Sequence, residues 1–269
     1  MMKNKKLFLI VLMLFTMLNV NSLICQQSRE INESFSLNKD GRLTIDTYKG
    51  SINIETWEKE KVQVEVKIEA DGWDKYDEEK VKDTEIIFDS SPNTLTIKTD
   101  YDKIKSRSSS FWSRLSKNVG SLPFVHYKIT MPRTAELRIE DYKSDSKISN
   151  LNAHIDFETY KGEVVIRNLT GSIDIETYKG DVRVEFLDMS DRSRFETYKG
   201  DITVELPETA KFDFNASIGK KADFDSDFGF EIKQKGNRKK DRRIEGRING
   251  GGPELYIENE KGEIQIRKK

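Results

Sequence analysis

A five-residue repeat constrains this chain more than any other feature of its sequence. The string ETYKG occurs at 158–162, 176–180 and 196–200, with near copies DTYKG at 46–50 and EDYKS at 140–144. Aligned on the glycine or its substitute, four of these copies are 18, 18 and 20 residues apart: Ser144, Gly162, Gly180 and Gly200. A buried core needs only apolar residues, so literal copies of Glu, Tyr and Lys indicate that the copies contact one another.

The residues between the copies alternate as residues in strands do. In the run 173–178 (IDIETY), both isoleucines and the threonine share one face, while the aspartate, glutamate and tyrosine share the other. Gly171 lies midway between Gly162 and Gly180 and opens a similar run. The elementary unit is therefore a glycine turn followed by a short strand, about nine residues in all.

Two all-β topologies fit such units, and the copying distinguishes them. In an antiparallel meander or β-sandwich, residues 18 apart lie on strands that do not touch. In a β-solenoid (β-helix), a single strand path with coils of about 18–20 residues, they stack directly, ~4.8 Å apart. The repeat therefore favours a β-solenoid, with an antiparallel β-sandwich or meander as the alternative.

The start of the chain predicts export. Lys3, Lys5 and Lys6 precede an apolar run over 7–18, which is typical of a secretory signal peptide over residues 1–25. Cys25 is the only cysteine, so no intrachain disulfide can form. A lipid anchor on Cys25 is the alternative to cleavage after it, and Ile24 disfavours the anchor because a small residue usually stands there.

The remaining chain is expected to hold one domain. We expect an N-terminal leader over 26–39 and a β-solenoid domain over 40–269, with a serine-rich insertion loop at 103–123. No second apolar run suggests a transmembrane span. The chain has 46 basic and 47 acidic residues of interspersed sign, which gives no general attraction to nucleic acid.

The sequence predicts no catalytic or metal site, and no cofactor. His126 and His154 lie in strand contexts without a second histidine at ligand spacing. No glycine-rich phosphate loop or GxSxG elbow occurs. The repeated glutamates would form a row, whereas an acid–base pair needs two carboxylates with unequal surroundings. A cation held between them is a rival interpretation, although no calcium-type loop accompanies the row.

Several segments together resemble a large bacterial family, the exported "putative adhesins" with short-strand repeats and no assigned function. They are Ile54–Val64, Tyr127–Pro132, the Thr-Tyr-Lys-Gly turns and the closing run from Gly250 to Ile266. The resemblance covers nearly all of residues 40–267. It implies a right-handed β-solenoid, exported to the periplasm, the outer membrane surface or the medium, without known catalytic residues.

The candidate binding residues are the outward-facing tyrosines and lysines of the repeat: Tyr142, Tyr160, Tyr178, Tyr198, Lys143, Lys161, Lys179 and Lys199. Tyr48 could extend the tyrosine row, and the lysines could offset repulsion among the stacked glutamates. The row could serve stability alone, or it could be a strip that contacts a glycan or a surface protein. The functional alternatives are a carbohydrate-active β-solenoid enzyme and an envelope scaffold that self-associates through solenoid ends.

Overall fold

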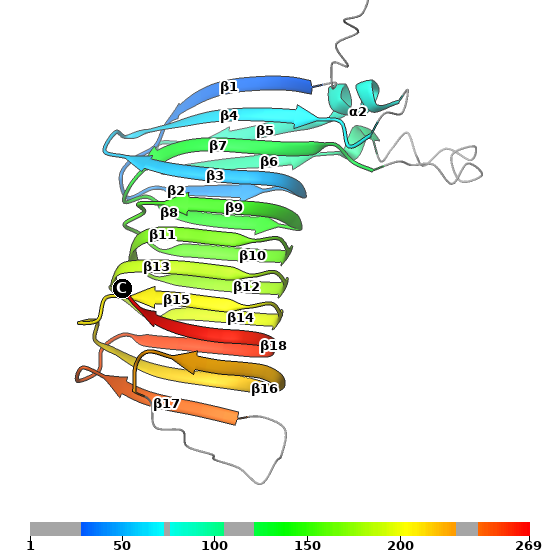
Figure 1. Ribbon diagram of the computed structural model, residues 1–269. Helices are drawn as coiled ribbons and strands as arrows, with labels where there is room; N and C mark the ends of the chain where they lie inside the picture. Colours follow the sequence, from blue (N-terminus) through cyan, green and yellow to red (C-terminus); the bar gives the residue numbers. More distant parts are fainter. Residues whose placement is uncertain (1–27, 73–75, 105–120, 230–241) are drawn as a thin grey trace, which may run out of the picture.

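The computed structural model describes residues 28–72, 76–104, 121–229 and 242–269, and these form a tall stack of strands (Figure 1). The strands are β1 (Ser28–Ser36), β2 (Arg42–Asp46), β3 (Lys49–Trp57), β4 (Lys61–Glu69), β5 (Glu85–Ser90), β6 (Thr94–Asp100), β7 (Phe124–Pro132), β8 (Glu136–Asp141), β9 (Lys143–Ser149), β10 (Ile155–Lys161), β11 (Val164–Gly171), β12 (Ile173–Lys179), β13 (Val182–Met189), β14 (Ser193–Lys199), β15 (Ile202–Leu206), β16 (Phe212–Ser226), β17 (Arg242–Ile248) and β18 (Glu254–Lys268). A short helix, α2 (Asp77–Asp83), lies beside one end of the stack.

The strands stack in two parallel columns that are joined by bends. The first column runs β6-β2-β8-β10-β12-β14, and the second runs β7-β3-β9-β11-β13-β15. Equivalent repeat positions face each other, so Glu158 lies opposite Glu176 and Lys161 opposite Lys179. The all-β prediction and its solenoid-like stacking are confirmed, and parallel pairing excludes a meander for these strands. The right hand of the coil stays a prediction.

The order of coils in the stack differs from their order in the chain. The coil of β2 and β3 lies between the coil of β6 and β7 and that of β8 and β9. At the other end, the long strand β18 spans both columns and lies between β14/β15 and β16. We expected coils to follow one another in sequence, and the structure instead inserts one coil near each end.

Antiparallel strands lie at the two ends of the stack. β4 pairs with β7, β1 pairs with β4, and β5 pairs with β6 at the upper end in Figure 1. β17 pairs with β16 at the lower end. Because β1 begins at Ser28, most of the segment expected as a 26–39 leader is a strand of the sheet. These antiparallel strands cover the open edges of the end coils, so no further parallel coil follows there.

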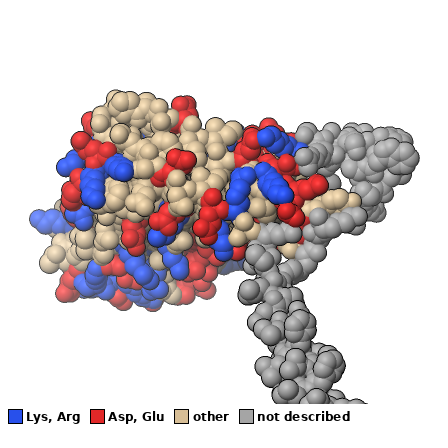
Figure 2. Space-filling model, turned by 90° about the horizontal axis from the view of Figure 1, so that it is seen from above, with Lys and Arg blue, Asp and Glu red and all other residues tan. Residues whose placement is uncertain are grey.

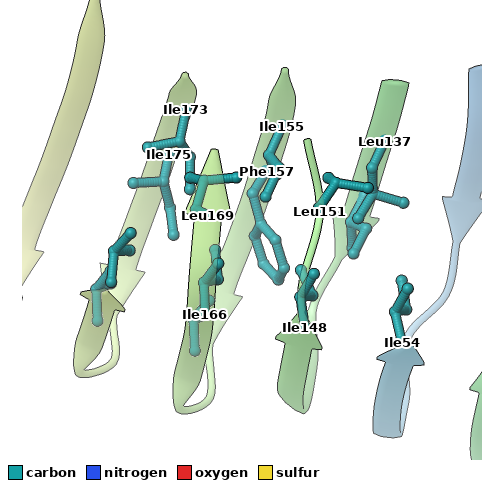
Figure 3. Packing of buried hydrophobic residues seen from close by; sticks show 14 of the residues in the cluster. Ile54, Leu137, Ile148, Leu151, Ile155, Phe157, Ile166, Leu169, Ile173 and Ile175 are labelled. Carbon is teal, nitrogen blue, oxygen red and sulfur yellow. The ribbon is translucent and has the colours of Figure 1, made fainter. Parts of the chain in front are cut away.

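The core is the space between the two columns. Apolar side chains at alternate positions point inward, as Figure 3 shows for Ile155 and Phe157 of β10 facing Ile166 and Leu169 of β11. These four side chains are fully buried. Equivalent positions in successive coils are again apolar, so the layers pack on one another along the whole stack. The alternation thus fixes which residues are left on the outside.

Glycine is required at the bend because successive rungs approach closely there. A Cβ on Gly162 would lie 2.0 Å from the carbonyl oxygen of Ser144, and one on Gly180 would lie 2.1 Å from that of Gly162. Gly162 also has a φ of 140°, a value that L-residues rarely adopt. The repeated glycine is therefore a steric requirement of the stack.

Several predicted segments lie outside the described residues. These are the signal peptide at 1–25 with Cys25, and positions 105–120 of the insertion at 103–123. The described flanks of the insertion are tied to the first coils, since Lys49 Nζ donates to Ser121 Oγ at 2.6 Å and Tyr101 donates to the Pro123 carbonyl at 3.3 Å. Within the described residues, no helix is long and apolar enough to cross a membrane.

Candidate functional site

The tyrosines of the repeat form one continuous row on the outer face of the first column. Ring centroids of neighbours are 4.6–5.0 Å apart and the planes are parallel within 15°, in the order Tyr48, Tyr142, Tyr160, Tyr178, Tyr198. Each side chain is 37–40% exposed. Tyr101 ends the row with an edge-on contact to Tyr48. The predicted row is present, and Tyr48 extends it across the inserted coil.

The stacking limits what the tyrosine row can contact. Parallel rings at these separations are offset-stacked, so each inner ring has both faces partly covered by its neighbours. The exposed parts are ring edges and hydroxyl groups. The flat strip of ring faces that would stack on sugars is therefore not what the row presents, and hydrogen bonding through hydroxyls is its main polar capability.

A row of carboxylates runs parallel to the tyrosine row, two residues earlier on each strand. Register places its members opposite one another: Asp46, Glu140, Glu158, Glu176, Glu196 and Glu258. Between this glutamate row and the tyrosine row lies a groove of about 610 Å³, whose floor is the backbone around the repeat threonines. Glu260, which takes the tyrosine position in β18, also lines this ladder groove.

Arginines, rather than the repeat lysines, offset the charge of the glutamate row. Arg138 donates to Glu140 at 2.9 Å, contacts Asp156 and lies 3.7 Å from Glu158. Arg194 likewise pairs with Glu196. Both arginines lie two residues before a row glutamate, on the same strand and face. Period-two alternation contained this signal, but these ion pairs were not predicted from the sequence.

The expected pairing of the lysines with the glutamates is wrong. Among the described residues, no ion pair joins a row glutamate to any member of the lysine row, Lys143, Lys161, Lys179 and Lys199. They follow the tyrosines at the bend, on the side away from the groove, and all but the half-buried Lys161 are exposed. The ammonium of Lys179 lies 5.1 Å from the Tyr178 ring centroid. The tyrosine row therefore separates the two rows of opposite charge.

Two other lysines at the same repeat position behave differently. Lys49 is buried, donates to Asp71 at 2.6 Å and lies 4.3 Å from the Phe124 ring centroid, so it binds the end segments to the stack. Lys261 of β18 places its ammonium 4.4 Å from the Tyr198 ring centroid and donates to the Tyr198 hydroxyl at 2.8 Å. That hydrogen bond lowers the pKa of Tyr198. Lys261 thus covers one end of the tyrosine row.

In the near copy EDYKS at 140–144, aspartate replaces the repeat threonine and serine replaces the repeat glycine. Asp141 takes the place of the inward threonine and accepts hydrogen bonds from Ser144 N, Ser144 Oγ and Thr159 Oγ1 at 2.7–2.9 Å. Burial raises the pKa of Asp141, and these hydrogen bonds oppose the rise. The side chain stabilises a bend where serine replaces glycine. Its surroundings give it a structural role.

The described residues offer no site for metal chemistry. They contain no group of three or more His, Cys, Asp or Glu side chains placed to hold a metal ion. His126 contacts Ser51 through Nδ1 at 2.9 Å and Glu69 through Nε2 at 3.2 Å, and burial lowers its pKa. His154 contacts Ser172 at 2.9 Å. Each histidine is engaged by neighbouring side chains in its own part of the stack.

Comparison with solved structures finds several distant likenesses. A putative cell adhesion protein from Clostridium sporogenes is 14% identical, with 90% of this chain and 100% of that chain covered and a TM-score of 0.45. A putative adhesin from Bacteroides fragilis is 14% identical, covering 88% and 97%, at a TM-score of 0.43. A putative lipid binding protein from Parabacteroides distasonis is 12% identical, covering 90% and 97%, at 0.30. Likenesses of this size carry no functional assignment.

No curated protein matches the chain. The sequence profile of one family does match, over residues 133–267, which is half of the chain and includes every coil from β8 to β18. The resemblance drawn from the repeat and its flanking motifs is thereby confirmed: the chain belongs to the Toastrack DUF4097 family, in keeping with the putative adhesins it resembles.

Proposed function

We propose that this protein is a non-catalytic binding protein of the cell envelope or cell surface. Its contact surface is the ladder strip, which consists of the glutamate row, the ladder groove, the tyrosine row and the lysine row. The partner class is a surface protein or a glycan. The lack of an assembled catalytic group in the described residues leaves binding as the chemistry that this face offers.

The observation that carries the proposal is the regularity of the strip. Five tyrosines present their edges and hydroxyls at a constant spacing, between an acidic groove and a line of lysines. At the end of the molecule viewed from above, by contrast, basic and acidic residues are interspersed, as Figure 2 shows. Tyrosine supplies a large contact area at a low cost in side-chain entropy and is enriched in binding surfaces.

The enzyme alternative has less support from the strip. Carbohydrate cleavage needs two carboxylates in a cleft with their pKa values pushed apart. The members of the glutamate row lie one to a rung along the groove, and the groove carboxylate whose pKa is raised, Asp141, is held by Ser144 and Thr159. Stacking of a scaffold through solenoid ends would have to involve the antiparallel strands β1, β5 and β17.

A direct test replaces three consecutive tyrosines of the row. The variant Tyr160→Ser/Tyr178→Ser/Tyr198→Ser is compared with wild type for binding to bacterial cells and to a glycan array. Binding is expected to fall strongly. Loss of the ring stacking costs roughly 0.2–1 kcal/mol per pair, so a modest drop in melting temperature accompanies it.

A matched control separates contact from stability. The exposed Lys147, Arg167 and Glu55 on the second column are replaced by serine, which leaves the strip intact. If the tyrosine variant melts lower but binds as wild type does, the row serves stability alone and the proposal fails.

A further inference from the structure

We propose that the partner of the ladder strip is a second copy of this chain, bound face to face. The tyrosine row of each copy lies in the ladder groove of the other, and the lysine row of each copy lies over the partner's glutamate row. This inference rests on the proposed function, because it assumes that the strip is a contact surface. It goes further by naming the partner.

The order of the rows makes the strip complementary to itself. Across the face, the glutamate row comes first, followed by the groove, the tyrosine row and the lysine row. A two-fold axis parallel to the stacking direction reverses this order in the facing copy. The tyrosine row of one copy then lies over the ladder groove of the other, and the lysine row lies over the glutamate row. A two-fold axis along the strands would instead place the two glutamate rows against each other. A symmetric pair needs such a self-complementary patch.

The spacing of the rows also agrees. The rows have the same spacing in both copies because the two copies have the same structure. Neighbouring tyrosine ring centroids are 4.6–5.0 Å apart along the row. An axis parallel to the stack keeps each rung opposite its own equivalent. Glu158 of one copy then faces Lys161 of the other, and Glu176 faces Lys179. Contacts made at one rung are therefore repeated at the next.

The contacts required are ones that the chain already makes internally. The Tyr256 hydroxyl donates to Glu258, a member of the glutamate row, at 2.9 Å. Burial and this contact raise the pKa of Tyr256 to about 12, so it remains a donor at neutral pH. Lys261 shows that an ammonium group fits against a tyrosine of the row. A facing copy would supply the same donors along the whole groove.

The charges that the pair would use are the ones least satisfied within one copy. Among the described residues, Glu176 has no ion-pair partner, and Glu158 has only the contact with Arg138 at 3.7 Å. The lysine row has no ion pair with any described acidic residue. Because the tyrosine row separates the charges within a copy, a facing copy is the simplest source of opposite charge for both rows.

The size of the strip sets the strength of the contact. Five rungs span only ~20 Å at the usual strand spacing. The area buried is therefore far below the roughly 800 Å² per partner of a standard interface, and one pair binds weakly. Many copies held on one surface would bind side by side through multivalency, without needing a stable dimer in solution. Because the two-fold axis points both stacks in the same direction, self-recognition of this kind suits lateral assembly of copies on one cell surface.

Charge exchange tests the inference directly. Residues 26–269 are biotinylated through a long flexible N-terminal linker, which lets copies on two beads align with their stacks in the same direction. They are coupled densely to beads of two colours, and clustering is measured by microscopy. Wild-type beads are expected to cluster. Beads carrying Glu158→Lys/Glu176→Lys or Lys161→Glu/Lys179→Glu should each cluster about tenfold less among themselves, because like charges then oppose each other. Mixed beads of these two variants should cluster at least as well as wild type.

Matched controls carry the same changes in charge outside the strip. They are Glu55→Lys/Asp188→Lys and Lys147→Glu/Arg167→Glu, all exposed positions of the second column. These variants should cluster as wild type does, and their circular dichroism and melting temperatures check that every variant is folded. If net charge alone drives clustering, the control variants and the strip variants will reduce clustering to the same extent.

The outcomes separate this inference from the proposed function. If wild-type beads do not cluster, or the mixed variants fail to restore clustering, a second copy is not the partner. The proposed function still stands in that case if the tyrosine variant loses binding to cells or glycans. If neither self-clustering nor tyrosine-dependent binding is observed, both proposals are overturned.

Discussion

The bend glycine offers the sharpest test of the stack. Replacing Gly162 by alanine places a Cβ 2.0 Å from the Ser144 carbonyl oxygen, so the rungs must move apart locally. Overpacking of this kind costs about 1–3 kcal/mol. A φ of 140° adds backbone strain of about 1–3 kcal/mol for an L-residue. The free energy of unfolding is therefore expected to fall by about 2–6 kcal/mol.

Two further glycines separate the causes. In Gly180→Ala the new Cβ lies 2.1 Å from the Gly162 carbonyl oxygen, but φ is not in the positive range, so only the overpacking cost of about 1–3 kcal/mol applies. In Gly229→Ala no atom lies within 4 Å of the Cβ, and a change within about 0.5 kcal/mol is expected.

Urea denaturation followed by circular dichroism measures all three variants against wild type. The expected order of destabilisation is Gly162→Ala, then Gly180→Ala, then Gly229→Ala. A Gly162→Ala variant as stable as Gly229→Ala would refute the argument that the carbonyl contact and backbone strain require glycine at the bend.

Three other predictions follow from single features. The buried hydroxyls of Thr177 and Thr197 have no hydrogen-bond partner, so Thr177→Val/Thr197→Val should raise the free energy of unfolding by about 1–3 kcal/mol. Thr159→Val, which removes a hydrogen-bond donor to Asp141, should lower the free energy of unfolding. Thermal denaturation of the variants and the wild type measures both effects. Lys49→Met should cost about 3 kcal/mol at pH 7. Burial tends to raise the pKa of Asp71, but the hydrogen bond from Lys49 keeps this pKa below its usual value of 3.8. The stability that the Lys49–Asp71 pair contributes is therefore present above pH 3.8 and disappears as the pH falls through the folded-state pKa of Asp71. An equal cost of Lys49→Met at pH 2 and pH 7 would contradict this reasoning. Deleting residues 254–269 removes the partner of β14, β15 and β16 and should abolish the cooperative unfolding transition seen by calorimetry.

Local pattern predicted the strands and their register well. Alternation identified the inward residues, and the literal copies at 18 and 20 residues predicted that Glu158, Glu176 and Glu196 lie opposite one another, as they do. Both signals are properties of single coils or of neighbouring coils. Stacking needs only these properties, so sequence was sufficient for this part of the fold and for the tyrosine row.

Features that depend on contacts between residues distant in the chain were not predicted from the sequence. Residues 258–262 have the same alternation as the other copies of the repeat. That alternation does not predict that β18 lies between β14/β15 and β16. The lysine pairing was wrong because the bend carries these side chains beyond the tyrosines. Arg138 and Arg194 were available to inspection, since residues two apart in a strand share a face.

The position of β18 has a consequence for how the protein is made. Strand β18 occupies a layer inside the stack, so β14, β15 and β16 each keep an unpaired edge until residues 254–268 have been synthesised. The stack therefore cannot be completed while residues before β18 are being synthesised. For the cell-envelope protein that we propose, this delay keeps the chain unfolded enough for translocation until β18 pairs with its neighbours.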